Sequence, residues 1–172
     1  RELSRDGLAG KLPPIGVMVE VPSAVYQARA KAKRVDFLSV GSNDLTQYLL
    51  AVDRNNARVA RLYHSLHPAV LKALEEVAVA GVAENVPVGI CGELAGDPGA
   101  AVLLLAMGYD VLSMNATSLP KVKNALRHIR GSEARELLEE VMAMDYADEI
   151  SRRLERFPAE HGMERFIHSP VE

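Results

Sequence analysis

Four short apolar runs recur along the chain and alternate with longer segments of helical periodicity. The runs are IGVMVEV (15–21), VDFLSVG (35–41), PVGICG (87–92) and DVLSMNA (110–116). Runs that are apolar at successive positions are typical of parallel strands buried on both faces, whereas strands with one solvated face alternate apolar and polar residues. The pattern therefore predicts four parallel strands.

The segments between and after these runs have the spacing and end residues of helices. Serine, aspartate or proline stands at several of their starts, and apolar residues follow at intervals of three and four. Helices are expected at 23–33, 67–84, 97–107, 118–129, 132–143 and 145–157. The last two are rich in Glu and Arg, and their charged faces are most simply solvated surface. Strands that alternate with helices predict an α/β fold, with a parallel sheet and helices packed outside it.

We expect three parts along the chain. Residues 1–14, RELSRDGLAGKLPP, are interpreted as the end of a preceding helix and a turn. Residues 15–130 form the α/β body, and 131–172 form a C-terminal helical tail. Because the first residue is Arg1 and not methionine, we expect the chain to be a piece of a longer protein.

Composition excludes several classes of function. The net charge is −3 and no basic stripe with interleaved aromatics is present, so nucleic acid is not an expected partner. A single cysteine rules out an internal disulfide and suits a reducing compartment. No apolar run approaches the roughly 20 residues that span a bilayer, and no signal-peptide pattern opens the chain. We therefore expect a cytoplasmic protein with no membrane partner.

Polar residues stand at the carboxyl ends of the expected strands, where ligands collect in parallel α/β folds. Glu20 ends the first run, and Asn43 and Asp44 follow the second. The two carboxylates supply the hard oxygen donors that suit Mg²⁺. Arg54, on the loop beyond Asp44, could pair with a carboxylate or clamp an anionic substrate. The residues alone leave open both a metal site and an arginine–carboxylate network.

Cys91 ends the third run, in the segment GICGELAGDP. A buried cysteine is more often a small apolar side chain than a reagent. Its strand-end position, the glycines on both sides and the carboxylates at neighbouring strand ends favour a reagent here. A thiol with an ordinary pKa of about 8.5 holds its proton at neutral pH yet can release it, which suits a general acid. The five histidines show no metal-ligand spacing, and no P-loop or dinucleotide fingerprint is present.

Three segments resemble signatures of the phosphoenolpyruvate-utilising enzymes: GVMVEVPSAV, DFLSVGSNDLTQYLLAVDRNN and GICGELAGDP. NDLTQ is shared across that superfamily, whereas AVDRNN is similar to Enzyme I, the phosphoenolpyruvate–protein phosphotransferases of the bacterial phosphotransferase system. The stretches ARLYHSLHPAVLKAL and MGYDVLSMNATSLPKVKNALRHI most resemble the nitrogen-regulatory paralogues. The resemblance covers residues 12–130, and the tail matches more loosely.

The resemblance implies a role for each strand-end residue. Glu20 and Asp44 correspond to the ligands of a Mg²⁺ cofactor. Asn43, Asp44 and Arg54 correspond to substrate-binding residues, and Cys91 corresponds to the proton donor that converts enolpyruvate to pyruvate. The implied reaction moves the phosphoryl group of phosphoenolpyruvate to a protein histidine. The implied partners are a histidine-containing phosphocarrier protein and a second copy, in a homodimer.

The family's catalytic domain is a (β/α)8 barrel of the TIM type, and this chain corresponds to its C-terminal half, the last four βα units, followed by helices. Two further substrate-binding arginines and a phosphoacceptor histidine in a Thr-Ser-His motif have no counterpart in the sequence. We therefore expect the chain alone to be inactive, and its two unpaired strand edges to favour self-association.

Other interpretations remain open. The chain could act only as a phosphoenolpyruvate-binding or dimerisation module. It could also come from a pyruvate phosphate dikinase or phosphoenolpyruvate synthase, or from a Mg²⁺-dependent aldolase or lyase that acts on pyruvate enolates.

Overall fold

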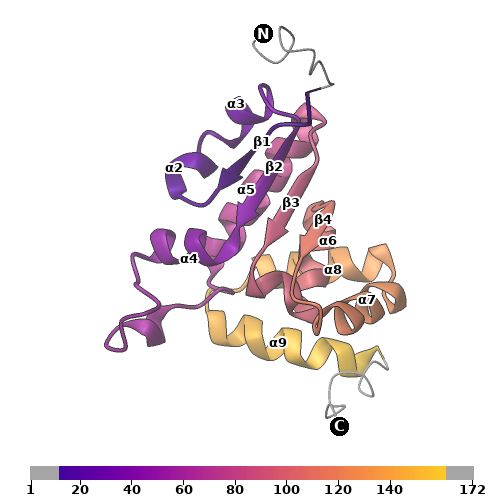
Figure 1. Ribbon diagram of the computed structural model, residues 1–172. Coiled ribbons are helices and arrows are strands. Elements are labelled where there is room, and N and C mark those ends of the chain that lie inside the picture. Colours follow the sequence, from indigo (N-terminus) through magenta and orange to yellow (C-terminus); the bar gives the residue numbers. More distant parts are fainter. Residues whose placement is uncertain (1–11, 162–172) are drawn as a thin grey trace, which may run out of the picture.

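The computed structural model describes residues 12–161 (Figure 1). It contains four parallel strands, β1 (Gly16–Val19), β2 (Phe37–Gly41), β3 (Val88–Cys91) and β4 (Val111–Ser113), in the sheet order β1-β2-β3-β4. The prediction of four parallel strands is confirmed, with β1 and β4 at the two edges. The expected helix end at the start of the chain falls mostly on residues 1–11, which lie outside the described residues, as does the end of the tail.

The helices of the described part follow the strands as an α/β fold requires. They are α2 (Pro22–Val25), α3 (Ala28–Ala32), α4 (Ser42–Leu50), α5 (Pro68–Glu84), α6 (Pro98–Met107), α7 (Leu119–His128), α8 (Gly131–Met142) and α9 (Ala147–Glu160), with the short 3₁₀ helices η1 (Ala60–Leu62) and η2 (Glu93–Gly96). None of them is both long and apolar enough to cross a membrane.

Two details of the predicted pattern are wrong. The single helix expected at 23–33 is two short helices, because Gln27 leaves the helical region with φ −106° and ψ 6°. The pattern also misses α4, because its first turn is polar and directly follows the second apolar run. Leu45 lies fully buried inside α4, and the helix ends at Ala51, which adopts a left-handed φ of 53°. Asp44 therefore lies in the first turn of a helix.

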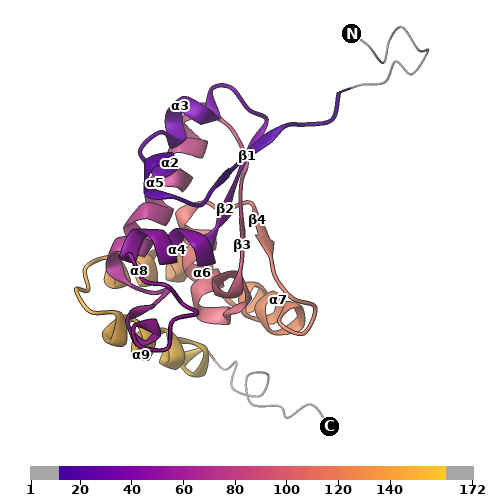
Figure 2. The same ribbon diagram turned by 60° about the vertical axis from the view of Figure 1, so that its left-hand side comes forward.

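The two faces of the sheet differ in what covers them. Val19, Val40 and Ile90 are partners in one row across the sheet and are buried against helices. Figure 2 shows the sheet nearly edge-on, with α2, α3 and α5 on one side of β1 and β2. On the other side, Met18 and Val111 remain 48% and 54% exposed. We call this second side the open face; by strand alternation it carries Met18, Phe37, Ser39, Gly89 and Val111.

The two tail helices pack on the body. Leu137 of α8 and Ile150 and Leu154 of α9 are buried in the same core as the sheet residues. Contact with α6 is close: a Cβ on Gly99 would lie 3.0 Å from the Cβ of Leu154. Apolar positions of the segment 132–157 therefore dock on the body.

Candidate active site

One row of residues crosses the carboxyl edge of the sheet on its open face. Gly41 pairs with Cys91, and Cys91 pairs with Ser113. Glu20 follows Val19, the partner of Val40, so it continues the same row beyond Gly41. Because alternate residues of a strand point to the same face, this row shares the open face with the apolar positions behind it. The sheet thus brings Glu20 and Cys91 within two strand spacings of each other.

Gly41 makes room for the Glu20 carboxylate. A Cβ on Gly41 would lie 2.5 Å from Glu20 Oε1, so the carboxylate occupies the space that a side chain would fill. No side chain among residues 12–161 forms a hydrogen bond or ion pair with this carboxylate. The Glu20 carboxylate therefore lies over Gly41, at the carboxyl end of β2.

Asn43 and Asp44 lie in the first turn of α4, directly after Gly41. Asp44 is paired with Arg54, whose Nη2 lies 3.6 Å from Asp44 Oδ1. Both side chains are more than a third exposed, so this pair contributes at most about 1 kcal/mol to stability. The backbone N–H of Arg54 also donates to Gln47 Oε1, at 3.3 Å. The loop after α4 thus brings Arg54 to the helix start, and the expectation that Arg54 can pair with a carboxylate is confirmed.

Tyr63 is a residue of the site that the sequence pattern did not single out. It lies beyond η1, and its hydroxyl donates to the carbonyl oxygen of Asn43 at 3.2 Å. Burial raises the pKa of Tyr63 above its ordinary value of 10.0, against the opposing influence of Thr46 and Arg54. The tyrosine fastens the far end of the Arg54 loop to α4. The sequence contains no local signal for Tyr63, because its role depends on a tertiary contact with α4.

Cys91 is half-buried, and its backbone is bonded to α4. The Oγ of Ser42 donates to the Cys91 carbonyl oxygen at 2.9 Å. The next residue, Gly92, has φ 122°, a conformation that side chains rarely allow. A Cβ there would overlap Ser42 Oγ and would lie 3.1 Å from Asn43 Oδ1. The glycine after Cys91 is therefore required both by backbone conformation and by close approach to α4.

A pocket of about 380 Å³ opens beside this row. It is lined by Asn43, Gly92, Glu93, Gly96, Ser113, Met114 and Asn115. The lining comes from the carboxyl ends of β2, β3 and β4, which is where the parallel fold predicts a ligand site. Its polar groups are amides, a hydroxyl and one carboxylate.

The donor set suits a magnesium ion without forming a closed cage. Among the described residues, no three His, Cys, Asp or Glu side chains are grouped closely enough to hold a metal by themselves. Magnesium in phosphate-processing sites is commonly held by one or two carboxylates together with waters and substrate oxygens. Glu20, with no side-chain partner among residues 12–161, and Asp44, in an exposed ion pair, are compatible with that arrangement.

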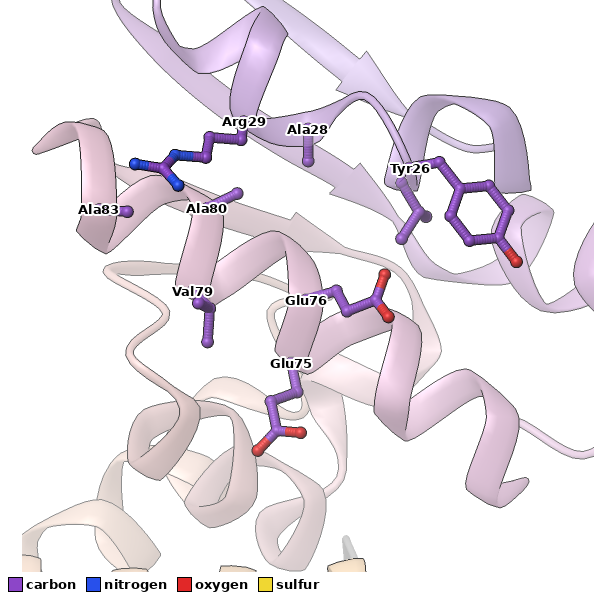
Figure 3. A pocket seen from close by; sticks show the side chains of 9 residues that line it. Tyr26, Ala28, Arg29, Glu75, Glu76, Val79, Ala80 and Ala83 are labelled. Carbon is purple, nitrogen blue, oxygen red and sulfur yellow. The ribbon is translucent and has the colours of Figure 1, made fainter.

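A second pocket, of about 350 Å³, lies on the helical side of the molecule (Figure 3). It lies between α5, which contributes Glu75, Glu76 and Val79, and the segment of α2 and α3, which contributes Tyr26 and Arg29. Arg29 Nε donates to Glu84 at 2.7 Å. The pocket contains none of the predicted site residues, so we do not assign the candidate site to it.

The fold and the strand-end row define an α/β domain whose ligand site lies at the carboxyl edge of a parallel sheet. Residues 1–131 match the family model of the PEP-utilising enzymes, at its PEP-binding domain. The chain belongs to this family, and the resemblance inferred from its motifs is confirmed at that level.

The relatives are phosphotransferases. The chain is 46% identical over 157 residues to the "Phosphoenolpyruvate-dependent phosphotransferase system" protein of Salmonella typhimurium, covering 91% of this chain and 21% of the relative. It is 46% identical over 149 residues to the "Phosphoenolpyruvate-protein phosphotransferase" of Haemophilus influenzae, covering 87% of this chain and 26% of the relative. It is 42% identical over 153 residues to the Haloferax volcanii protein of the same name, covering 89% of this chain and 27% of the relative. The chain thus spans about a fifth to a quarter of the length of these relatives.

Proposed function

We propose that this chain is the C-terminal half of the barrel of a phosphoenolpyruvate–protein phosphotransferase, and that it supplies the metal ligands and the proton donor of the reaction. The observation that carries the proposal is the row at the carboxyl edge of the sheet. The Glu20 carboxylate lies over Gly41, Gly41 pairs with Cys91, and Ser42 of α4 donates to the Cys91 carbonyl; this proximity supports the proposal. Family membership supports phosphoenolpyruvate as the substrate.

Asn43, Asp44 and Arg54 bind the substrate in this proposal. The Asn43 amide donates to the phosphate, and the Arg54 guanidinium binds an anionic group of the substrate in place of part of its contact with Asp44. Glu20 and Asp44 hold Mg²⁺, which when bound offsets negative charge on the transferring phosphoryl group and on the enolate left behind.

Cys91 completes the reaction as general acid. Its S–H proton is transferred to the methylene carbon of the enolate of pyruvate, a C–H bond forms, and the electron pair of the S–H bond stays on sulfur as thiolate. The thiolate then regains a proton from solvent. Protonation at carbon converts the enolate to pyruvate and removes it from the reverse reaction.

The histidine that accepts the phosphoryl group lies elsewhere in this proposal, as do the phosphocarrier contacts and the first half of the barrel. We place the chain in the nitrogen-regulatory branch because of its ARLYHSLHPAVLKAL and MGYDVLSMNATSLPKVKNALRHI segments. A sensor domain encoded upstream in the same reading frame would support that branch, and its absence there would contradict it.

The experiment that tests the function is a segment swap. The 149-residue matching segment of the Haemophilus influenzae phosphotransferase is replaced by the aligned part of this chain, and pyruvate release from phosphoenolpyruvate is measured with Mg²⁺. We expect turnover to be retained. Cys91→Ala should lower pyruvate release by about 10²- to 10⁴-fold, the usual contribution of a general acid. Glu139→Gln, at an exposed residue of α8, is the matched control and should not change the rate. Undiminished pyruvate release in Cys91→Ala would contradict the proposal.

A further inference from the structure

Ser42 connects the two segments of the candidate site, the first turn of α4 and the end of β3 at Cys91. It is the first residue of α4 and is fully buried, and its Oγ reaches across to the end of β3 to donate to the Cys91 carbonyl. Its own carbonyl oxygen accepts a bond of 2.8 Å from Thr46 Oγ1, one turn further along the helix. Ser42 and Thr46 are the two fully buried polar residues in the part of the chain that the structure describes.

The contact leaves little freedom to the turn that follows Cys91. Gly92 lies so close to Ser42 that no side chain could stand between them, and its φ of 122° brings the turn onto the first turn of α4. The carbonyl of Cys91 and the backbone of Gly92 therefore rest on the residue that immediately precedes Asn43 and Asp44.

We propose that Ser42 is a positioning residue, which through its bond to the Cys91 carbonyl fixes the thiol relative to Asn43 and Asp44. The inference rests on the proposed function, in which Cys91 delivers a proton to the substrate that Asn43 and Asp44 help to hold. Proton transfer to carbon depends on the distance between donor and acceptor, and a misplacement near 1 Å can cost up to about 10²-fold in rate. The hydroxyl of Ser42 sets that distance without touching the substrate.

Alkylation of the full 172-residue chain tests the placement directly, because Cys91 is its only cysteine. The rate of modification by iodoacetamide is measured at one fixed pH for the wild type, Ser42→Ala and Ser42→Thr. We expect Ser42→Ala to react about fivefold faster, the ratio that one ordinary hydrogen bond is worth. Ser42→Thr keeps a hydroxyl and should restore the wild-type rate. Ser39→Ala, a half-buried serine on β2 with no side-chain bond among residues 12–161, is the matched control.

The segment swap separates positioning from a merely structural role. Phosphoryl transfer and pyruvate release are measured on the same preparation, and their ratio does not depend on how much of the protein is folded. We expect Ser42→Ala to lower pyruvate release about tenfold relative to phosphoryl transfer, and Ser42→Thr to recover the ratio. A fall in both rates by the same factor would overturn the inference, as would equal alkylation rates in wild type and Ser42→Ala. Undiminished pyruvate release in Cys91→Ala would instead overturn the proposed function, while the alkylation rates would still show whether Ser42 holds the thiol.

Discussion

Replacing Gly41 by alanine should weaken metal binding at the proposed site while leaving the stability of the fold almost unchanged. Gly41 has φ −88° and ψ 90°, which any residue can adopt, so the backbone does not oppose the change. The new Cβ would lie 2.5 Å from Glu20 Oε1 and 2.8 Å from Glu20 Cγ. Non-bonded carbons are comfortable at about 3.5–4.0 Å, so the Glu20 side chain must retreat by roughly 1 Å.

The retreat should cost little folding free energy. Glu20 is a flexible side chain with no hydrogen-bond partner among residues 12–161, so it can rotate away into solvent. Glycine-to-alanine replacement also lowers the entropy of the unfolded chain, by about 0.4–1 kcal/mol. We therefore expect a free energy of unfolding within about 1 kcal/mol of wild type. The carboxylate, however, would be displaced from its place at the strand end.

Binding of Mn²⁺, used as a paramagnetic substitute for Mg²⁺, measures that displacement. Titration of the full chain, followed by the electron paramagnetic resonance signal of free Mn²⁺, should show affinity reduced about 10- to 100-fold in Gly41→Ala, as for other changes that misorient a metal ligand. Gly89→Ala is the control: its Cβ would meet Val111 Cβ at an ordinary 3.4 Å on the same face. Equal Mn²⁺ affinity in wild type and Gly41→Ala would refute the reasoning, and so would an affinity that Glu20→Gln leaves unchanged.

Three further outcomes are expected. Burial raises the pKa of the Tyr109 hydroxyl above 10.0 in the folded chain. As the pH rises, the hydroxyl therefore ionises in the unfolded chain before it does so in the folded chain. The contribution of Tyr109 to the free energy of unfolding should be constant below about pH 10 and fall above it. In urea titrations, the free energy of unfolding of Tyr109→Phe should fall less above pH 10 than that of the wild type. At neutral pH the variant should be about 1 kcal/mol less stable, because it lacks the hydrogen bond to the Leu74 carbonyl. An equal fall above pH 10 in both proteins would contradict this prediction. Light scattering should show that the chain self-associates, because the edge strands β1 and β4 each have only one paired side in the described sheet. Val111→Lys, on β4, should give monomers because an unpaired charge buried in that contact is costly, whereas Val79→Lys on the helical side should not. A monomeric wild type would contradict this prediction. Incubation of the chain with phosphoenolpyruvate and Mg²⁺ should give no acid-labile phosphate, and a phosphohistidine signal in ³¹P spectra would contradict the prediction.

The sheet was predictable because buried parallel strands have a simple sequence signature. Each of the four apolar runs contains one strand, and the sheet order follows the chain order. The strand-end residues followed from the strands, since parallel strands bring their carboxyl ends to one edge. The helices with strong caps were also predictable: α6 is capped by Asp97, whose Oδ1 accepts the Ala100 N–H at 2.7 Å.

What the sequence could not provide depends on contacts between distant segments. The first turn of α4 is polar because it faces the candidate site. The helical spacing of Leu45 and Leu49 therefore begins only after that turn and is too short to predict a helix from the pattern. Ser42 and Tyr63 are ordinary residue types, and their importance arises from partners 49 and 20 positions away. The glycine at 41 likewise acquires its role only when Glu20 lies over it. Local propensity does not contain such information.

The family match ends at residue 131, yet the folded unit continues beyond it. Helix α9 reaches back to Gly99, in the first turn of α6, so closely that only a glycine fits there without a shift of Leu154. That turn begins seven residues after Cys91 and is connected to it through η2. The tail is therefore a brace behind the turn that carries the thiol. Cutting the chain at the family boundary would remove the support of α6 and loosen the turn that carries Cys91, the proton donor of the proposed function, although no residue of the sheet would have been changed.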